Sequence, residues 1–249
     1  MAKKQKTFEG NRMKFYLDDF RNVMPLKNIQ TVIVDPPYNI NFNYGKNFKD
    51  NIEPEEYKQL MYDVADLSYK STKEDSSMFI INYPEIIAEL FQTLKKTDWN
   101  IHQWISWVYP SNIGHSKRKF TTAHRTILWL VKENPKVNID AVTQPYKNPT
   151  DKRVRELIKS GKKGTHLYDW WEINLVKNIS KDKKQYVNQI PSEVLKRLIL
   201  TTTDSKDKVL DPMCGTGSAA IEAANLRRSG IGIDINSELI KIWNENIKN

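Results

Sequence analysis

The chain has 249 residues, 39% of them hydrophobic and 28% charged, and this composition excludes general disorder and suffices for one large α/β domain. Its formal net charge of +9 favours a polyanionic partner, and no apolar run approaches the roughly 18 residues of a membrane span or forms a secretory signal. Cys214 is the only cysteine and the four histidines lack metal-ligand spacing, so we expect a reducing cytoplasm, no internal disulfide and no metal site.

Short apolar runs alternate with helical patterns along the chain. In chain order, the expected elements are a strand at 31–34, a helix at 54–70, strands at 78–82, 101–108 and 126–131, a helix at 192–203, a strand at 208–210, a helix at 217–228 and a strand at 231–233. The helix at 54–70 begins with Pro54 and places its apolar residues on one face. Because the strands lack a polar face, we expect a mostly parallel sheet that helices cover on both sides.

The segment between the expected strand at 126–131 and the expected helix at 192–203 differs from the rest of the chain in composition and charge. Residues 132–188 are polar and their apolar residues follow no clear period, which predicts an inserted region. Residues 115–188 hold 17 Lys and Arg against 7 Asp and Glu, whereas the remainder holds 22 against 23. This segregated charge favours nucleic acid as the partner. We therefore divide the chain into a first part (1–131), a basic insertion (132–188) and a last part (189–249).

The strand at 31–34 runs directly into Asp35-Pro36-Pro37-Tyr38, at the carboxyl end where parallel sheets place ligands. The Asp35 carboxylate and the Pro36 carbonyl could each accept one N–H bond from an exocyclic amino group and free its lone pair for in-line attack on a sulfonium methyl group. The prolines make the turn rigid, and Tyr38 could stack on a base rotated out of the duplex. Alone, the tetrapeptide would more simply be a turn with a capping Asp.

A second segment, 208–236, reads as strand, glycine loop, helix, strand and acid. Gly215 and Gly217 allow a sharp turn and a close ligand, and Asp234 could accept bonds from both hydroxyls of a ribose. Residues 215–220, GTGSAA, also match the G-x-G-x-x-A form of the dinucleotide-binding motif, so a nicotinamide dinucleotide must be considered as the cofactor. Asp211 argues against it, because a carboxylate there would repel a pyrophosphate but suits a nucleoside that carries an ammonium group, such as S-adenosylmethionine.

With these motifs in this order, the chain resembles the amino-group DNA methyltransferases of the β class, from about Met13 onward. The segments that carry the resemblance are 13–40, 109–132, 187–200 and the loop VLDPMCGTGSAAIEAA at 209–224. It implies a Rossmann-like methyltransferase fold of seven strands with a reversed hairpin strand at one edge, S-adenosylmethionine as methyl donor and duplex DNA as substrate. The DPPY form of the tetrapeptide implies adenine more often than cytosine.

The resemblance also implies roles for individual residues. It makes Asp35, Pro36, Pro37 and Tyr38 catalytic. The implied cofactor-binding residues are Asp35, Asn188, Asp211, Pro212, Met213, Cys214, Gly215, Thr216, Gly217 and Asp234. Met213 departs from the family, which usually has phenylalanine there. Asp18 falls where such chains often place a cofactor contact, although a helix cap is the simpler interpretation.

Basic residues in and before the insertion are the candidates for holding DNA. They are Lys117, Arg118, Lys119, Arg125, Arg153, Arg155, Lys162 and Lys163. The loop at 39–51, which directly follows the tetrapeptide, is well placed to close over a flipped base. The resemblance adds a homodimer and a cognate restriction endonuclease as candidate partners.

Three alternatives remain open at this point. Cytosine could replace adenine as the target base. Related tetrapeptides also serve RNA and protein amides as substrates. Finally, the chain could be a DNA-binding module without catalysis, which would have no affinity for S-adenosylmethionine.

Overall fold

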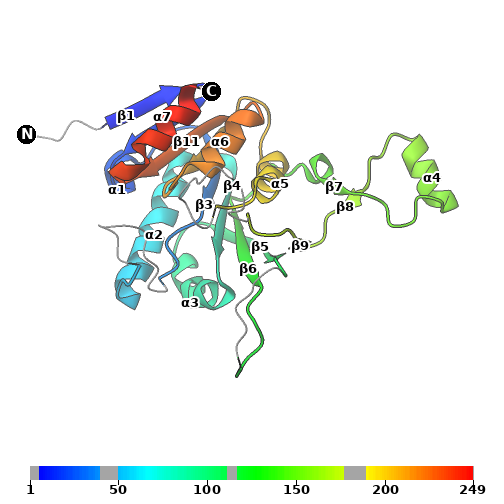
Figure 1. Ribbon diagram of the computed structural model, residues 1–249, viewed down its shortest axis with the longest axis horizontal. Helices are drawn as coiled ribbons and strands as arrows, with labels where there is room; N and C mark the ends of the chain where they lie inside the picture. Colours follow the sequence, from blue (N-terminus) through cyan, green and yellow to red (C-terminus); the bar gives the residue numbers. More distant parts are fainter. Residues whose placement is uncertain (1–5, 40–49, 111–116, 177–188, 249) are drawn as a thin grey trace, which may run out of the picture.

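The computed structural model describes residues 6–39, 50–110, 117–176 and 189–248. Within them, nine strands form one mixed sheet in the order β1-β2-β11-β10-β3-β4-β6-β5-β9. The strands are β1 (Lys6–Gly10), β2 (Met13–Leu17), β3 (Ile29–Val34), β4 (Thr72–Asn82), β5 (Asn100–Val108), β6 (His124–Val131), β9 (Trp170–Glu172), β10 (Lys208–Asp211) and β11 (Ser229–Asp234). Figure 1 shows the twisted sheet running through the body of the molecule.

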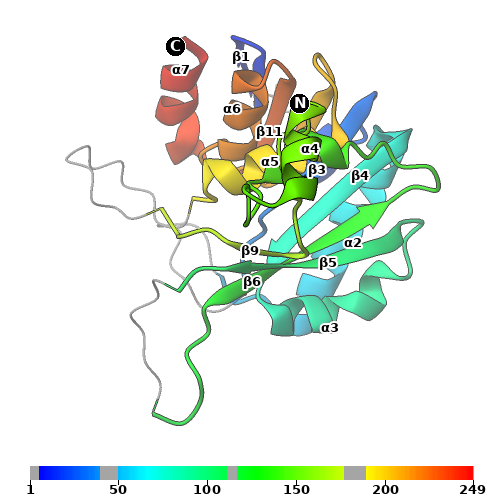
Figure 2. The same cartoon turned by 90° about the vertical axis from the view of Figure 1, so that its right-hand side faces the viewer.

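The strand directions confirm a mostly parallel sheet, in which two strands, β1 and β6, run opposite to the others. From β2 to β4 every neighbouring pair is parallel, whereas β6 runs antiparallel to both β4 and β5. The seven strands from β2 to β5 match the expected number, and each edge carries one strand more. At one edge β1 forms a hairpin with β2, and Asn11 and Arg12 make the turn with positive φ angles. At the other edge β9 pairs in parallel with the end of β5 (Figure 2).

Helices cover both faces of the sheet. They are α1 (Phe20–Val23), α2 (Pro54–Ser71), α3 (Pro84–Leu94), α5 (Ser192–Thr202), α6 (Ser218–Asn225) and α7 (Ile240–Lys248). All six residues of β3 are buried, and their side chains alternate between the two layers. Val32 and Val34 pack with α2 and α3 in one core cluster, whereas Ile33 packs with α5 and α6 in the other. The buried strand ends at Val34, so the chain leaves the sheet at the tetrapeptide.

The insertion contains short elements. They are η1 (Ile139–Ala141), β7 (Thr143–Gln144), α4 (Lys152–Lys159) and β8 (Thr165–His166), and β7 pairs with β8 in a separate two-stranded sheet. Figure 1 shows α4 projecting away from the sheet. Because β9 comes from the same segment and joins the main sheet, the insertion is attached to the body by a strand pairing as well as by its two chain ends.

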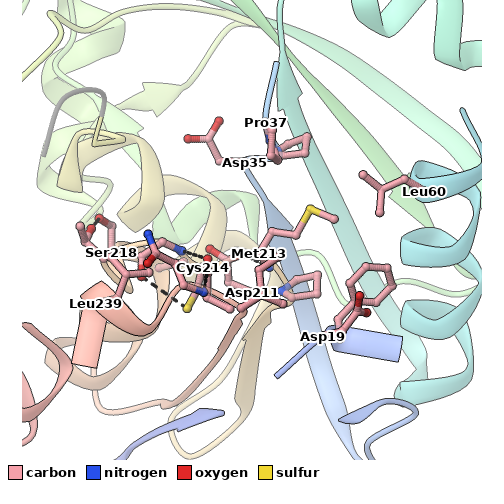
Figure 3. Close-up of a pocket in the computed structure, with 18 of the residues that line it drawn as sticks. Asp19, Asp35, Pro37, Leu60, Asp211, Met213, Cys214, Ser218 and Leu239 are labelled. Atoms are coloured by element: carbon pink, nitrogen blue, oxygen red, sulfur yellow. Dashed lines mark hydrogen bonds between the residues drawn. The ribbon is translucent and has the colours of Figure 1, made fainter. Parts of the chain in front are cut away.

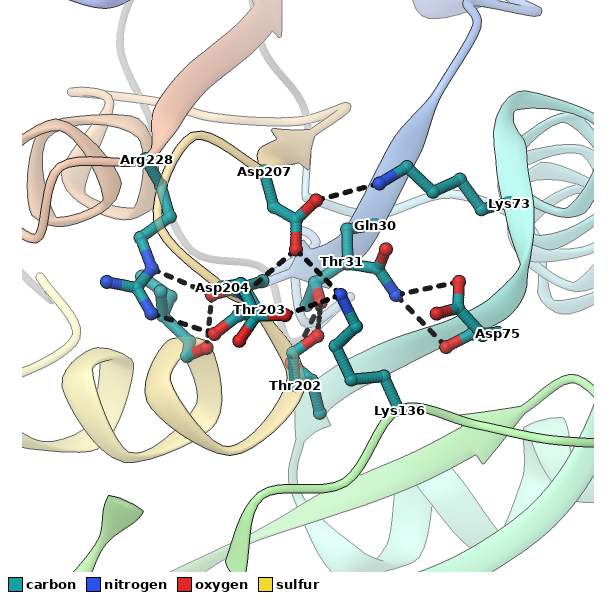
Figure 4. A network of polar contacts seen from close by, with 11 residues as sticks. Gln30, Thr31, Lys73, Asp75, Lys136, Thr202, Thr203, Asp204, Asp207 and Arg228 are labelled. Carbon is teal, nitrogen blue, oxygen red and sulfur yellow. Dashed lines mark hydrogen bonds and ion pairs between the residues drawn. The ribbon is translucent and has the colours of Figure 1, made fainter.

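A polar network joins the start of the insertion to the sheet (Figure 4). The largely buried Asp207 accepts hydrogen bonds from Lys73 Nζ at 2.7 Å and from Lys136 Nζ at 3.2 Å, and Asp204 accepts from Lys136 at 2.8 Å. Burial alone would raise the pKa of Asp207. The bonds from Lys73, from the Asp204 amide and from Lys136 outweigh burial, so the pKa lies below its usual value.

Asp207→Asn is expected to lower the free energy of unfolding by about 1–2 kcal/mol at pH 7, because the Lys73 ammonium loses its charged partner and the Lys136 ammonium keeps only Asp204. A carboxyl with a lowered pKa stabilises the fold above its unfolded-state pKa and loses this contribution as the pH falls. The difference between wild type and variant in urea denaturation should therefore shrink toward about pH 3. Glu74→Gln is the control, because the exposed Glu74 lies 3.6 Å from Lys132 and should contribute little. A difference that persists unchanged at low pH would contradict this assignment.

Candidate active site

A cavity of about 510 Å³ opens at the carboxyl ends of β3, β10 and β11, where parallel sheets bind ligands. Figure 3 shows Asp35 and Pro37 at one end of this cavity and Cys214, Ser218 and Leu239 at another, with Asp211 and Met213 between. The structure thus brings together two motifs that lie more than 170 positions apart in the sequence. The predicted residues that line the cavity are Asp35, Pro36, Pro37, Tyr38, Asp211, Pro212, Met213, Cys214, Gly215, Thr216 and Asp234.

The tetrapeptide is held by hydrogen bonds from two tyrosines. Tyr38 donates its hydroxyl to Asp35 Oδ1 at 2.6 Å. Tyr57 on α2 donates to the Pro37 carbonyl at 2.7 Å, and its oxygen accepts from Asn82 Nδ2 at 3.1 Å. Helix α2 therefore fixes the turn from the side, and the Asp35 carboxylate is oriented by its own neighbour.

The Tyr38 ring does not form an open platform in this structure. It is 3% exposed and lies edge to face with Tyr83, with ring centroids 5.3 Å apart. The guanidinium of Arg125 lies 4.7 Å from the centre of the same ring. These contacts occupy one edge and one face of the ring, and the stacking role stays a prediction.

Main-chain amides of the glycine loop and of the turn after β11 bind the Asp234 carboxylate. Gly215 N donates to Asp234 Oδ2 at 2.8 Å, and Asn236 N donates to Oδ1 at 2.9 Å. Gly215 has φ of 49° and Gly217 has φ of 87°, both in the left-handed region. A Cβ at Gly217 would meet the Phe15 ring at 2.5 Å, so this glycine serves close packing and, unlike its neighbours, is absent from the cavity lining.

Five carboxyl groups line the cavity and make it electrostatically negative, and three of them have raised pKa values. Burial raises the pKa of Asp211 well above its usual value; the Met213 amide, which donates to Oδ1 at 3.1 Å, opposes this rise, and the charges of Asp35 and Asp234 add to it. Burial likewise raises the pKa values of Asp35 and Asp234. Such a cluster is most stable in its charged form when a cation lies beside it.

Lining residues supply little positive charge of their own. Among the described residues, Arg21 is the one basic residue of the lining, and it pairs with Asp63 at 2.9 Å and Asp19 at 3.4 Å. The cavity is therefore suited to a cationic ligand with an apolar body. It is poorly suited to a pyrophosphate, which confirms the argument from Asp211 against a dinucleotide.

The predicted DNA-binding residues divide into two groups. Lys117, Arg118, Lys119, Arg153, Arg155, Lys162 and Lys163 are exposed. Arg125 is only 3% exposed, and this corrects its assignment to the DNA-binding surface, since a phosphate cannot reach a guanidinium packed among aromatic rings. Asn188 and most of the loop at 39–51 lie outside the described residues.

Several lining residues were not among the predicted ones. They are Asp19, Phe20, Arg21, Ile52, Leu60, Gln189, Ile190, Ser218, Ala219, Ile235, Asn236 and Leu239. Asp18, which the resemblance offered as a cofactor contact, lines the cavity too, and its Oδ1 accepts from Asp19 N and Asn22 Nδ2, whereas the cap of α1 is Asp19. Residues 18–21 directly follow β2, and this position could have predicted that they line the cavity, because the carboxyl ends of parallel strands meet at one sheet edge.

Comparison with known proteins identifies related sequences and folds. The family described as DNA methylase matches residues 29–245. The chain is 29% identical to the type II methyltransferase M.HpaI of Haemophilus parainfluenzae, over 88% of this chain and 68% of the relative. It is also 29% identical to the DNA adenine methyltransferase YhdJ of Escherichia coli, over 88% and 76%. The solved PvuII DNA methyltransferase, which is cytosine-N4-specific, shares the fold with a TM-score of 0.69, 15% identity and coverage of 97% and 94%.

Proposed function

Since the chain belongs to the DNA methylase family, we propose that it transfers a methyl group from S-adenosylmethionine to the exocyclic amino group of adenine at a specific sequence in duplex DNA. The target base would be flipped out of the duplex to reach the cavity. The observation that supports this proposal best is the Asp35 carboxyl beside a cavity that also contains Asp211 and Asp234.

The cavity residues fit this methyl donor. Asp211 would accept bonds from its ammonium group, and Asp234 would hold the ribose hydroxyls through the oxygens that now bind main-chain amides. The positive charges of the donor would also restore ordinary ionisation to the three carboxyls. When bound, the donor would supply a methyl carbon attached to a positively charged sulfur, and the amino nitrogen, once methylated, would release one proton to water.

The tetrapeptide would act on the amino group before transfer. Asp35 Oδ1 accepts from Tyr38, and the second carboxylate oxygen would accept an N–H from the base. With the Pro36 carbonyl as a second acceptor, the nitrogen would lose its planar conjugation and direct its lone pair at the methyl carbon. Tyr38 orients the carboxylate in this scheme whether or not it also stacks on the base.

Incubation with labelled donor and DNA, followed by digestion to nucleosides, tests the target base. We expect N6-methyladenine, because Asp35 opens the DPPY form of the tetrapeptide and YhdJ is named for adenine. The name of the PvuII enzyme makes N4-methylcytosine the outcome that would replace adenine in the proposal. Label in RNA or protein, with none in DNA, would remove DNA as the substrate.

DNA affinity is expected to depend on exposed basic residues of α4. Replacing Arg153 and Arg155 with alanine should weaken DNA binding and reduce the slope of log affinity against log salt by about 0.9 for each phosphate that the variant no longer neutralises. The control with the same charge change is Lys58→Ala with Lys70→Ala on α2, which lies outside the insertion. Fluorescence anisotropy over a range of salt concentrations measures both slopes. An equal loss of affinity in the two double variants would contradict a DNA-binding role for α4.

Duplex DNA is the proposed partner, and the three-part division at 132 and 189 is the proposed domain organisation. A homodimer and a cognate restriction endonuclease are further proposed partners, the second supported by the type II designation of M.HpaI. Among the described residues, no helix is both long enough and apolar enough to cross a bilayer.

A further inference from the structure

A buried arginine lies next to the catalytic tetrapeptide. Arg125, on β6, is 3% exposed. Its guanidinium carbon lies 4.7 Å from the centre of the Tyr38 ring and 5.3 Å from that of Trp107. The rings of Tyr83 and Tyr109 are each 5.7 Å away. An arginine stays charged in proteins, and burying a charge is costly unless something compensates it, so this position calls for an explanation.

Aromatic rings surround this charge. Within the described ranges, neither Nε nor Nη1 of Arg125 has a hydrogen-bond partner, and no carboxylate oxygen lies within 4.0 Å of the guanidinium. Four electron-rich rings stabilise the cation by cation–π attraction. The arginine can therefore act on charges beyond its contact distance, because no carboxylate in direct contact cancels its field.

Asp35 is the carboxyl group on which this field acts. Burial raises the pKa of Asp35, and the Arg125 charge, followed by the hydrogen bond from Tyr38, opposes that rise. Within the described part of the chain, Asp211 on β10 is a further carboxyl group that interacts with Asp35, since the Asp35 charge raises the pKa of Asp211. Arg125 thus contacts the ring of Tyr38, whose hydroxyl binds Asp35, and its positive charge also acts on the Asp35 carboxylate.

We propose that Arg125 is the positioning residue of the active site, which holds the Tyr38 ring in place and keeps the Asp35 carboxylate charged and oriented to accept the amino group. Arg125 touches neither donor nor base in this scheme and acts through the tetrapeptide. The inference rests on the proposed function, because the charge of Asp35 matters to the reaction only if Asp35 accepts the N–H bonds of the base.

Kinetics over a range of pH separate this role from simple packing. Arg125→Met keeps an apolar chain among the rings but removes the charge. It should lower kcat by about 10- to 100-fold at pH 7, with the affinity for S-adenosylmethionine retained. Removing the cation raises the pKa of Asp35, so a smaller fraction of the carboxyl is charged at a given pH. The acidic side of the kcat–pH profile therefore moves to higher pH. Arg125→Lys keeps the charge, and its acid limb should stay where the wild type has it. A loss of activity in Arg125→Met that is equal at every pH would overturn the proposal.

A second measurement does not depend on activity. The Asp35 carboxyl can be titrated by carbon NMR in the protein without donor or DNA, with its signal assigned from Asp35→Asn. The titration should move to higher pH in Arg125→Met, or in Arg125→Gln if the methionine variant does not fold. An unmoved titration overturns the inference even if the wild type methylates DNA. A wild type that methylates no DNA refutes the proposed function instead, and the titration still decides the effect of Arg125 on Asp35.

Discussion

Asp35→Asn is expected to reduce kcat for methyl transfer by about 10²- to 10³-fold, the loss typical of removing one group that stabilises a transition state electrostatically. The asparagine keeps the size of the side chain and an oxygen that can accept from the Tyr38 hydroxyl. It replaces the second carboxylate oxygen with an NH₂ group, which cannot accept an N–H from the base. The affinities for the methyl donor and for DNA should be largely retained, so the loss falls on kcat.

Asp66→Asn provides the matched control for this prediction. Asp66 lies on α2, pairs with Lys70 at 2.7 Å and does not line the cavity, so the same chemical change should leave kcat unaffected. Single-turnover transfer to DNA at saturating donor separates chemistry from binding. Retention of more than about a tenth of the wild-type rate in Asp35→Asn would contradict the role assigned to this carboxylate.

Asp211→Asn is expected to have two opposite effects. The folded state raises the pKa of Asp211, and a carboxyl of this kind contributes stability below its unfolded-state pKa that is lost as the pH rises through the folded-state pKa. At neutral pH the neutral asparagine should therefore stabilise the ligand-free protein, by about 2–4 °C in Tm if the gain is about 1 kcal/mol. The variant should bind S-adenosylmethionine at least about tenfold more weakly, because the ammonium group loses its charged partner.

The pH dependence of binding gives a further check on Asp211. Donor affinity for the wild type should rise with pH, since the carboxyl groups must be charged to hold the ligand, and this rise should be smaller in Asp211→Asn. Isothermal titration calorimetry and thermal melting measure the two effects on the same samples. Loss of donor affinity together with a lowered Tm would mean that Asp211 is chiefly structural, because its Oδ1 accepts from the Met213 amide.

The sequence predicts the central part of the fold well, because its periodicities are strong there. The apolar run before Asp35 is the fully buried β3, and Pro54 begins α2 as expected. Helix α3 (Pro84–Leu94) was not predicted, although Pro84 is a start signal of the same kind. Strand β1 alternates exposed and half-buried residues, and such a short edge hairpin has too weak a pattern to identify without its partner.

The candidate site was also predicted only in part from the sequence. Sequence spacing indicated that Asp35 and the loop from Asp211 to Gly215 would meet, because each follows a parallel strand. It misplaced Arg125, which follows a basic cluster in the sequence but lies inside the protein. The register of β6 against β5 pairs it with Trp107, and burial among aromatic rings follows from that pairing. Contacts of this kind depend on tertiary packing, which local sequence does not encode.

Sequencing with detection of modified bases, on DNA from cells that express this chain, tests the central claim most directly. The account predicts methylated adenine at one recurring sequence, and its absence from cells that express Asp35→Asn at the same level. DNA without modified bases above the vector control, from cells that contain folded wild-type protein able to bind S-adenosylmethionine, would contradict it.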